Sequence, residues 1–457
     1  MCYVRKEGRV FKERKNGCIM RVHLGIDSTD SATQGMCTTY VGMMLAKKLL
    51  TRGIQFIDYP HLIRLNPNIP YKTRGNGAVA LRFQTDESLS DILSIARNTV
   101  EEYAVFSDSQ TNPGIALLTG DVPHRLHTFS ESALHTLLTV EDAFAAANAT
   151  GALLHGYKNQ RGIIGALAAV GEELKGDHTY ELIAYRKKEN WGTSRYIDVT
   201  SVIHMDQNSP DTFFNYDPEE QSVCIAPHSV CPVLIGIRGE TASAVARAVS
   251  LVDPGEEIAS SVIFRTNQHT SFHFEAVGTV HEISDYSSII CEGTVMREPW
   301  IIPGGHVFFQ LENAGSITCA AFEPTKKFRN IIRCLRRGDC IRVYGGVKPA
   351  TTSGSKKKER TINLERVDIL QLVTGTWKNP VCPHCQVSMT SKGRHQGYEC
   401  RKCGATKREK EWIPLSRNII PGSYEPPPSA WRHLYKFLSR DRINSGTALS
   451  LTESWIQ

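Results

Sequence analysis

The feature that most constrains this chain is a pair of Cys-x-x-Cys knuckles in its last hundred residues. Fourteen residues separate the two pairs, and the second pair is followed directly by a glycine. Two such knuckles place four thiolates tetrahedrally around one zinc ion, and closed four-sulfur sites are structural rather than catalytic. Chance rarely produces this spacing, so four unrelated core cysteines are a poor alternative. The sequence therefore predicts a structural zinc ribbon whose ligands are Cys382, Cys385, Cys400 and Cys403.

Positive charge is concentrated in the same part of the chain. Residues 324–442 hold 26 Lys and Arg against 9 Asp and Glu, whereas the whole chain has 53 against 47. Such asymmetry is typical of a basic part that meets a polyanion and a more acidic catalytic part. Charge alone leaves open a solvated basic surface with no partner.

Composition and length narrow the class of protein further. With 41% hydrophobic and 22% charged residues, the 457-residue chain can form packed cores, roughly two to four domains at about 150 residues each. The longest apolar stretch, near residues 162–171, is far shorter than the roughly 20 residues of a membrane span. The basic N-terminus lacks the apolar region of a secretory signal, and 13 cysteines is an odd number. We therefore expect a reducing, cytoplasmic location and no membrane association.

Short alternating strands precede the ribbon. Five β runs are expected at residues 273–283, 306–312, 316–322, 340–347 and 362–372, and a helix at 328–336 separates the third from the fourth. That order is typical of an OB-fold, which binds single-stranded or loop nucleic acid through backbone charge and base stacking. The fold alone leaves open a barrel that is only a spacer.

The N-terminal half carries an acidic loop between a strand and a helix. A strand at 20–26 ends in two carboxylates, and a helix begins after a glycine turn and runs to about residue 50. Paired carboxylates suit Mg²⁺, and a helix N-terminus offers free N–H groups to phosphate. A Walker A motif is absent, and an N-capping Asp/Ser/Thr cluster is the alternative. The candidate magnesium ligands are Asp27 and Asp30. The candidate phosphate-binding residues at the start of the helix are Gly35, Thr38 and Thr39.

Three further loops in this half are basic or rich in glycine. Lysine supplies a point charge and arginine a planar fork for phosphate, while glycines let the backbone approach closely. Each loop alone could be an ordinary turn, but together with the acidic loop they indicate a nucleotide site. The candidate phosphate-binding residues are Lys72, Arg74, Gly75, Asn76, Gly77, Asn112, Gly114, Lys158 and Arg161.

With these residues assembled, the chain resembles the archaeal isoleucine-tRNA 2-agmatinylcytidine synthetases from residue 20 onward. The most specific match is the block Pro-Tyr-Lys-Thr-Arg-Gly-Asn-Gly at residues 70–77. Other matches are Gly25-Ile-Asp-x-Thr-Asp-Ser, Gly35-Met-Cys-Thr-Thr, Thr111-Asn-Pro-Gly, Arg161-Gly-x-Ile-Gly-Ala, Arg265-Thr-Asn-Gln and the tail at 426–440.

The resemblance implies a multidomain α+β fold. It predicts a flexible leader (1–19), an ATP-binding kinase-like α/β domain (20–150), a ferredoxin-like domain (151–271), an OB-fold (272–373), and a zinc ribbon with a C-terminal tail (374–457). For that tail we expect a helix over residues 429–438, which three prolines precede because they cannot sit inside it.

The implied activity is an ATP-dependent ligation. Agmatine is attached to C2 of the wobble cytidine of the isoleucine tRNA with a CAU anticodon, and AMP and diphosphate are released. The family is described as phosphorylating a threonine of its own, which corresponds to Thr38. Ser28 departs from the family pattern, because a second adjacent aspartate is expected there.

The amine substrate carries a guanidinium, so its pocket needs carboxylates or carbonyls and an aromatic face. The candidates chosen on composition are Asp198, Phe214, Asn215 and Asp217. Two alternatives stay open for the whole chain: a nucleic-acid-binding protein without catalysis, and an ATP-dependent tRNA enzyme that uses another amine. The acidic and basic loops at 27–77 argue against the first, because a scaffold has no need of them.

Overall fold

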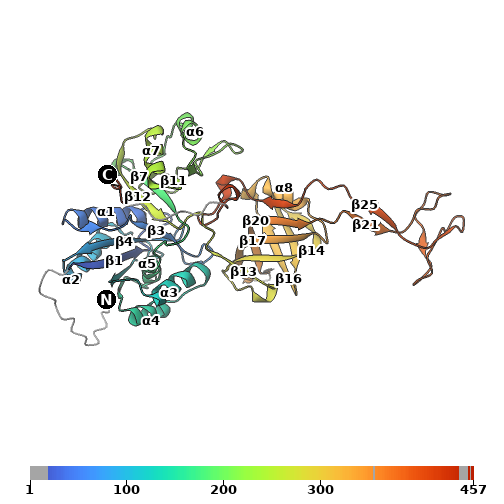
Figure 1. The fold of residues 1–457 in the computed structure, drawn as a ribbon, viewed down its shortest axis with the longest axis horizontal. Coiled ribbons are helices and arrows are strands. Elements are labelled where there is room, and N and C mark those ends of the chain that lie inside the picture. Colours follow the sequence, from blue (N-terminus) through green and yellow to red (C-terminus); the bar gives the residue numbers. More distant parts are fainter. Residues whose placement is uncertain (1–18, 354–355, 442–450, 453) are drawn as a thin grey trace.

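The computed structural model describes residues 19–353, 356–441, 451–452 and 454–457. The leader expected at 1–19 therefore lies, up to residue 18, outside the described residues. Figure 1 shows three parts in a row: a large α/β part, a β-barrel, and a long extension that carries the cysteines. The chain is thus a multidomain α+β protein, as the sequence predicts.

One ten-stranded sheet runs through the whole α/β part, in the order β6-β5-β1-β4-β3-β12-β7-β11-β8 with β2 on β4. Strands β3 and β12 are parallel and share only two residue pairs, Arg265 with His61 and Thr266 with Leu62. This short junction joins the two halves of the sheet. Its strands are β1 (Met20–Asp27), β2 (Gln55–Phe56), β3 (His61–Arg64), β4 (Gly77–Thr85), β5 (Gly114–Thr119), β6 (Leu153–Gly156), β7 (Thr179–Arg186), β8 (Thr212–Phe213), β11 (Val233–Gly239) and β12 (Ile258–Thr266).

Helices cover both faces of this sheet. Helices α1 (Thr38–Leu50) and α2 (Leu89–Tyr103) lie on one face, and α3 (His124–His135), α4 (Val140–Thr150) and α5 (Gly162–Gly171) lie on the other (Figure 1). Helices α6 (Val199–Asn208) and α7 (Ala242–Ala248) belong to the second half.

Helix α5 is apolar on every side and is buried along its whole length. It packs on β1 and β5, so the core of the first half continues past residue 150. Glycine makes the approach possible, because a Cβ at Gly25 would lie 2.1 Å from the carbonyl oxygen of Ala166.

The barrel closes because β14 pairs with both β15 and β17. Its elements are β13 (Phe274–Val277), β14 (Ser288–Ile302), β15 (His306–Glu312), β16 (Ser316–Ala321), α8 (Phe328–Arg333), β17 (Cys340–Lys348), β20 (Thr361–Gln371) and β26 (Gly422–Tyr424). The expected strand at 273–283 is wrong, since that stretch holds the short β13 and a 3-10 turn. The long first strand is β14, whose exposed charged residues hide its alternation.

The expected helix at 429–438 is also wrong. The tail has two 3-10 turns, Pro428–Ala430 and Leu438–Arg440, and the chain between them contains a further turn at 433–434 but no helix. Its backbone bonds outward instead: the carbonyls of His433 and Leu434 accept from the N–H groups of His269 (2.8 Å) and Ser271 (2.7 Å). Tertiary hydrogen bonds thus replace the intrahelical ones.

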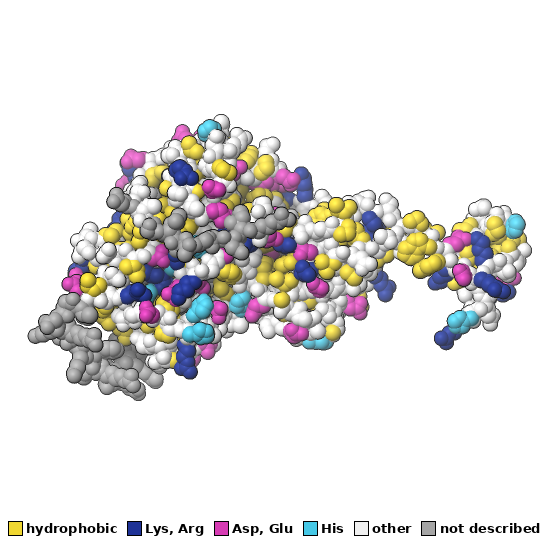
Figure 2. Space-filling view, in the orientation of Figure 1, with side chains coloured by type: hydrophobic (Ala, Val, Ile, Leu, Met, Phe, Trp, Pro, Cys, Tyr) yellow, Lys and Arg dark blue, Asp and Glu magenta, His cyan; other side chains and the backbone are white. Residues whose placement is uncertain are grey.

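A two-stranded hairpin connects the barrel to the cysteine module. Strand β21 (Gly375–Lys378) pairs with β25 (Glu411–Pro414), and β22 (Thr390–Ser391), β23 (Tyr398–Glu399) and β24 (Thr406–Lys407) form the module. Figure 2 shows hydrophobic side chains gathered where the extension leaves the barrel, and Lys and Arg side chains beyond them. Within the described ranges, the helices are too short or too polar to cross a bilayer.

Candidate functional site

A cavity of about 370 Å³ lies where the two halves of the large sheet meet. Its walls come from the end of β1, the start of α1, the loop at 71–77 and the second-half segment 222–233. The sequence-predicted site residues that line it are Asp27, Asp30, Thr38, Thr39, Lys72, Arg74, Gly75, Asn76, Gly77 and Phe214. The structure therefore brings the acidic loop and the longest basic loop together.

Asp27 ends β1, and its carboxyl group faces Gly165 in the first turns of α5. One carboxylate oxygen accepts a hydrogen bond from the Ser28 backbone N–H at 2.6 Å. Burial raises the pKa of Asp27 to about 8, the nearby Asp30 charge adds to the effect, and the Ser28 bond opposes it. A bound cation would favour the ionised form, so this side chain is chemically suited to a metal ligand.

Asp30 is held by the basic loop. Its two carboxylate oxygens accept hydrogen bonds from the Thr73 hydroxyl and from Arg74 Nε, both at 2.7 Å. The same guanidinium also donates to the Met36 carbonyl at 2.7 Å and to the Ser229 hydroxyl at 3.0 Å. Arg74 thus connects its own loop, the segment before α1 and the 222–233 segment to the Asp30 carboxylate.

Thr38 is the first residue of α1, and its side chain is buried beside the acidic loop. Its hydroxyl oxygen accepts a hydrogen bond from the Thr29 hydroxyl at 3.1 Å. Ser28, directly before Thr29, and Met36, two residues before Thr38, have positive φ values of 58° and 63°. Non-glycine residues adopt that conformation at a cost, and such residues cluster at functional sites.

Ser28, where the family pattern leads us to expect aspartate, has a structural contact. Its hydroxyl accepts a hydrogen bond from the Asn112 backbone N–H at 3.1 Å. The Asn112 carbonyl in turn accepts from the Gly162 N–H at 2.9 Å, at the start of α5. Ser28 thereby links the acidic loop to the beginning of that helix.

Five predicted phosphate-binding residues do not line the cavity wall. Gly35 forms a bridge with Ser31, and Gly114 packs so tightly that a Cβ would lie 2.1 Å from the backbone of Gly162. Lys158 is exposed and donates to the carbonyls of Phe106 and Asp108. Arg161 lies over the Tyr71 ring at 4.3 Å, near the mouth of the cavity. The fifth residue, Asn112, contributes the backbone contacts described above.

Lys72 lies between two cavities, the main one and a smaller one that borders the barrel. Its ammonium group donates to the Pro67 carbonyl. Burial, followed by the charges of Arg432 and Lys348, lowers the pKa of Lys72 to about 8. An anion placed there would stabilise the charged form.

Of the four amine-site candidates, only Phe214 lines the cavity. The Asp217 carboxylate is buried and accepts backbone hydrogen bonds from Glu219, Glu220 and Ser429. Asn215 donates to Asp206 and Thr212. Asp198 is exposed and caps the N-terminus of α6. The side chains of Asp198, Asn215 and Asp217 are thus already engaged in structural contacts.

The cavity wall also holds polar residues that the sequence reasoning missed. Glu181 pairs with Arg238 at 2.8 Å and accepts a hydrogen bond from Gln268. Arg238 lies over the Phe214 ring at 4.9 Å, and His433 of the tail completes this wall. One signal was present, because Glu181 is a charged residue inside the apolar strand β7, and buried charges demand a partner.

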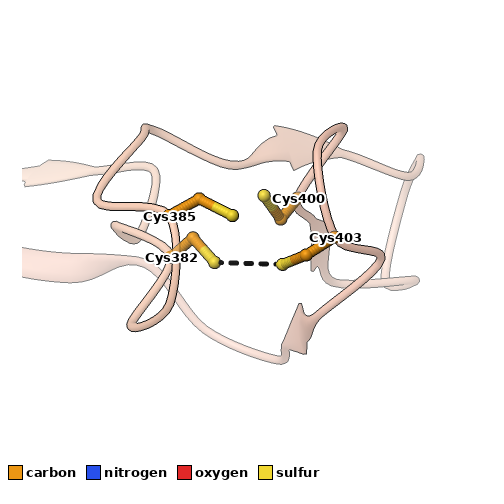
Figure 3. Close-up of side chains that lie close together, drawn as sticks. All are labelled: Cys382, Cys385, Cys400 and Cys403. Atoms are coloured by element: carbon orange, nitrogen blue, oxygen red, sulfur yellow. Dashed lines mark hydrogen bonds between the residues drawn. The ribbon is translucent and has the colours of Figure 1, made fainter.

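The four knuckle cysteines converge in the distal module. Their sulfur atoms all lie within 4.8 Å of one another, and those of Cys382 and Cys403 are 3.5 Å apart (Figure 3). Sulfurs about 2.3 Å from a central tetrahedral ion are roughly 3.8 Å apart, so the donor set and its spacing fit zinc.

The fold and the cavity together define a multidomain α+β enzyme with a ribbon-like four-cysteine module. Family models match the chain in three places: the TiaS TCKD domain at residues 23–159, the TiaS FLD domain at 160–273, and the TiaS C-terminal zinc ribbon domain at 379–419.

Curated relatives match nearly the whole chain. The isoleucine-tRNA 2-agmatinylcytidine synthetase TiaS of Archaeoglobus fulgidus is 42% identical over 428 residues, covering 93% of this chain and 98% of that protein. The protein of the same name from Pyrococcus horikoshii is 43% identical, covering 91% and 96%. The chain belongs to the TiaS family.

Solved structures agree with this assignment. A crystal structure of TiaS in complex with its isoleucine tRNA and ATP has a TM-score of 0.81 at 40% identity and covers 94% of this chain and 99% of that one. A complex of TiaS with the same tRNA, AMPCPP and agmatine has a TM-score of 0.80 at 39% identity, with the same coverage.

Proposed function

We propose that this chain is an ATP-dependent tRNA-modifying ligase. It attaches agmatine to C2 of the wobble cytidine of the isoleucine tRNA with a CAU anticodon, and it releases AMP and diphosphate. Relatives of this name and their complexes with tRNA, ATP and agmatine support the proposal. The observation that carries it is the single cavity in which two carboxylates, Arg74 and Thr38 meet.

The nucleotide end of the cavity lies at the acidic loop. In the proposal, Asp27 and Asp30 hold Mg²⁺, which neutralises phosphate charge during phosphoryl transfer. Arg74 and the backbone of residues 75–77 orient the phosphate groups, with Thr39 at the start of α1. Lys72 and Arg161 supply further positive charge at the rim, while Gly35, Asn112, Gly114 and Lys158 shape the loops that carry these groups.

Thr38 is the proposed acceptor of a phosphoryl group from ATP. Its hydroxyl accepts the Thr29 hydrogen bond and so keeps its own proton free to leave. Phosphorylation of Thr38 uses the γ-phosphoryl group of a separate ATP, which becomes ADP. In the ligation itself the cytidine O2 attacks the α-phosphorus of ATP and diphosphate leaves, so the activated O2 carries the AMP phosphate. The agmatine nitrogen then attacks C2 and loses a proton, the new C–N bond forms, and the C2–O2 bond breaks with AMP as the leaving group.

The amine end is proposed at Glu181 and Phe214. A guanidinium is recognised by carboxylates and by aromatic faces, and these two side chains line the same cavity, each in contact with Arg238. Asp198, Asn215 and Asp217 were chosen on composition and lie outside the cavity lining, so we assign them to shaping this region.

The remaining parts are proposed to hold the tRNA. We propose that the closed barrel is an OB-fold, that the four-cysteine module binds a structural zinc ion, and that the two halves of the α/β part are a kinase-like and a ferredoxin-like domain. The division at residues 150, 271 and 373, with a leader before residue 20, and a cytoplasmic location belong to the same proposal.

The test is incubation with labelled ATP, Mg²⁺, agmatine and the unmodified tRNA transcript. We expect agmatine-dependent AMP release, a mass gain on the wobble cytidine and a phosphorylated Thr38 in the protein. Thr38→Ala should abolish all three. Thr33→Ala is the matched control, because Thr33 is an exposed threonine of the same loop.

Other outcomes separate the alternatives. ATP turnover without the mass gain would point to another amine or another RNA. Tight tRNA binding without ATP turnover would favour a binding protein without catalysis and would overturn the proposal.

A further inference from the structure

Two tryptophans are exposed on the hairpin that connects the barrel to the four-cysteine module. Trp377 of β21 and Trp412 of β25 lie opposite each other in the antiparallel register, so both side chains are on one face. Their side chains are 59% and 47% exposed, and their ring centroids are 5.3 Å apart at 64°. Large exposed aromatic pairs on a surface usually mark a binding site.

A glycine sets the position of one of these rings. A Cβ at Gly375 would lie 2.3 Å from atoms of the Trp412 ring, so that ring lies directly over the glycine backbone. The Trp412 indole therefore packs against the hairpin backbone on one side, while about half of that residue stays exposed. The contact with Gly375 restricts the orientation of the Trp412 ring.

A basic cleft lies at the barrel end of the same hairpin. It has a volume of about 340 Å³, and its lining includes Asn330, Arg333, Arg336 and Arg417. It also includes Ser416, which follows the end of β25 by two residues, so the cleft and the aromatic pair are close neighbours along the chain. Arg333 and Arg336 are exposed, and Arg336 forms an exposed ion pair with Glu298 at 3.6 Å. Arg417 is held by Asp339 at 2.6 Å.

The module beyond the hairpin is also positively charged (Figure 2). Its exposed basic residues are Lys392, Arg394, Arg401, Lys402, Arg408 and Lys410. Flat aromatic faces between basic residues are the features that bind unpaired nucleotides: bases stack on the rings and phosphates meet the cations. An acidic protein would match the charge but has no need of two exposed indole rings.

We propose that Trp377 and Trp412 form a stacking platform for an unpaired tRNA nucleotide, with its flanking phosphate in the cleft of Arg333 and Arg336. The inference rests on the proposed tRNA substrate. The platform lies beyond the barrel from the catalytic cavity, so the stacked nucleotide is not the one that reacts (Figure 1). The platform contributes affinity and orientation, and the chemistry proceeds elsewhere.

The test compares tRNA affinity across variants of this hairpin. The double variant Trp377→Leu/Trp412→Leu keeps apolar bulk but removes the aromatic faces, and its Kd for the unmodified transcript should rise about tenfold. Trp377→Phe/Trp412→Phe keeps aromatic faces and should restore most of the affinity. Gly375→Ala displaces the Trp412 ring and should weaken binding although both tryptophans remain. Arg333→Gln should lower the salt dependence of binding by about one counterion.

Two readouts separate this inference from neighbouring explanations. The agmatine-transfer reaction of the leucine variant should show a raised KM for tRNA and an unchanged kcat, with zinc content equal to that of the wild type. The same penalty with an isolated anticodon stem–loop would support the platform with the nucleotide in that arm, and a penalty only with the full tRNA would support it with the nucleotide at an unpaired end.

Three results would overturn the platform. They are an unchanged Kd in the leucine variant, an equal loss in the phenylalanine variant, or a loss of bound zinc in the leucine variant that accounts for the weaker binding. If the wild type binds tRNA but transfers no agmatine, the proposed reaction fails while the affinity comparison still decides the platform.

Discussion

Asp27 and Gly165 approach so closely that a Cβ at Gly165 would lie 2.0 Å from the Asp27 carboxylate oxygen. Gly165→Ala should therefore displace the proposed metal ligand without touching it chemically. Alanine is the better helix former, so the helix should persist. A displacement near 1 Å commonly costs about a hundredfold in rate, and we expect a loss of that order in agmatine-dependent AMP release.

The matched control for Gly165→Ala is Gly176→Ala, where the added methyl group would meet only an ordinary contact 3.5 Å from Phe272. That variant should keep full activity. Wild-type kcat in Gly165→Ala, at normal thermal stability, would show that the close packing does not position Asp27.

The lowered pKa of Lys72 predicts that the KM for ATP depends on pH. Its pKa is lowered to about 8 by burial and by Arg432 and Lys348, so it is charged at pH 7 and mostly neutral at pH 9. If the ammonium contacts phosphate, the KM for ATP should rise as the pH increases through 8. Lys72→Arg keeps its charge over that range and should flatten the profile. A wild-type profile in Lys72→Met would remove Lys72 from the nucleotide site.

Metal removal should destabilise the distal module and leave the rest of the protein folded. The core of that module is small and consists mainly of Cys382, Cys400 and Met389, so a zinc site must supply most of its stability. Chelation, or Cys382→Ser, should expose the module to protease and weaken tRNA binding while ATP binding persists. Cys340→Ser lies outside the cluster and is the control. A protease-resistant module after complete chelation would argue against a structural metal.

Arg440 should be among the most sensitive positions of the tail. Its side chain is fully buried and forms ion pairs with Asp177 and Glu240, both at 2.8 Å. Arg440→Met removes the cation that these two carboxylates share, which should lower the free energy of unfolding by about 3–5 kcal/mol in urea titrations. Lys326→Ala, which breaks solvent-accessible pairs with Glu220 and Glu323, should leave it nearly unchanged. Equal effects would contradict this account.

Local sequence patterns were sufficient to predict the structure wherever one short segment determines it. The knuckle spacing placed four sulfurs together, and the strand–loop–helix order placed Asp27 and Thr38 at the ends of β1 and α1. The Gly-rich loop at 75–77, predicted from its local sequence, lines the cavity.

Contacts between distant segments were not predictable in the same way. The pairing of β3 with β12 spans about two hundred residues and rests on two residue pairs, for which no local pattern exists. Glu181 and His433 reach the cavity from the second half and from the tail. The tail was expected to be helical after its three prolines, but its backbone bonds to distant segments, which the local pattern does not reveal. Tertiary packing overrides local propensity in such segments.

The return of the tail to the α/β part has a consequence for biosynthesis. Asp177, Glu240 and the N–H of His269 belong to the first two-thirds of the chain, and all three bond to residues 433–440. The barrel and the cysteine module must therefore be synthesised before the tail can complete the cavity. A truncated chain that lacks the tail would have a cavity without His433, so ligase activity is coupled to synthesis of the barrel and the cysteine module, the proposed RNA-binding parts.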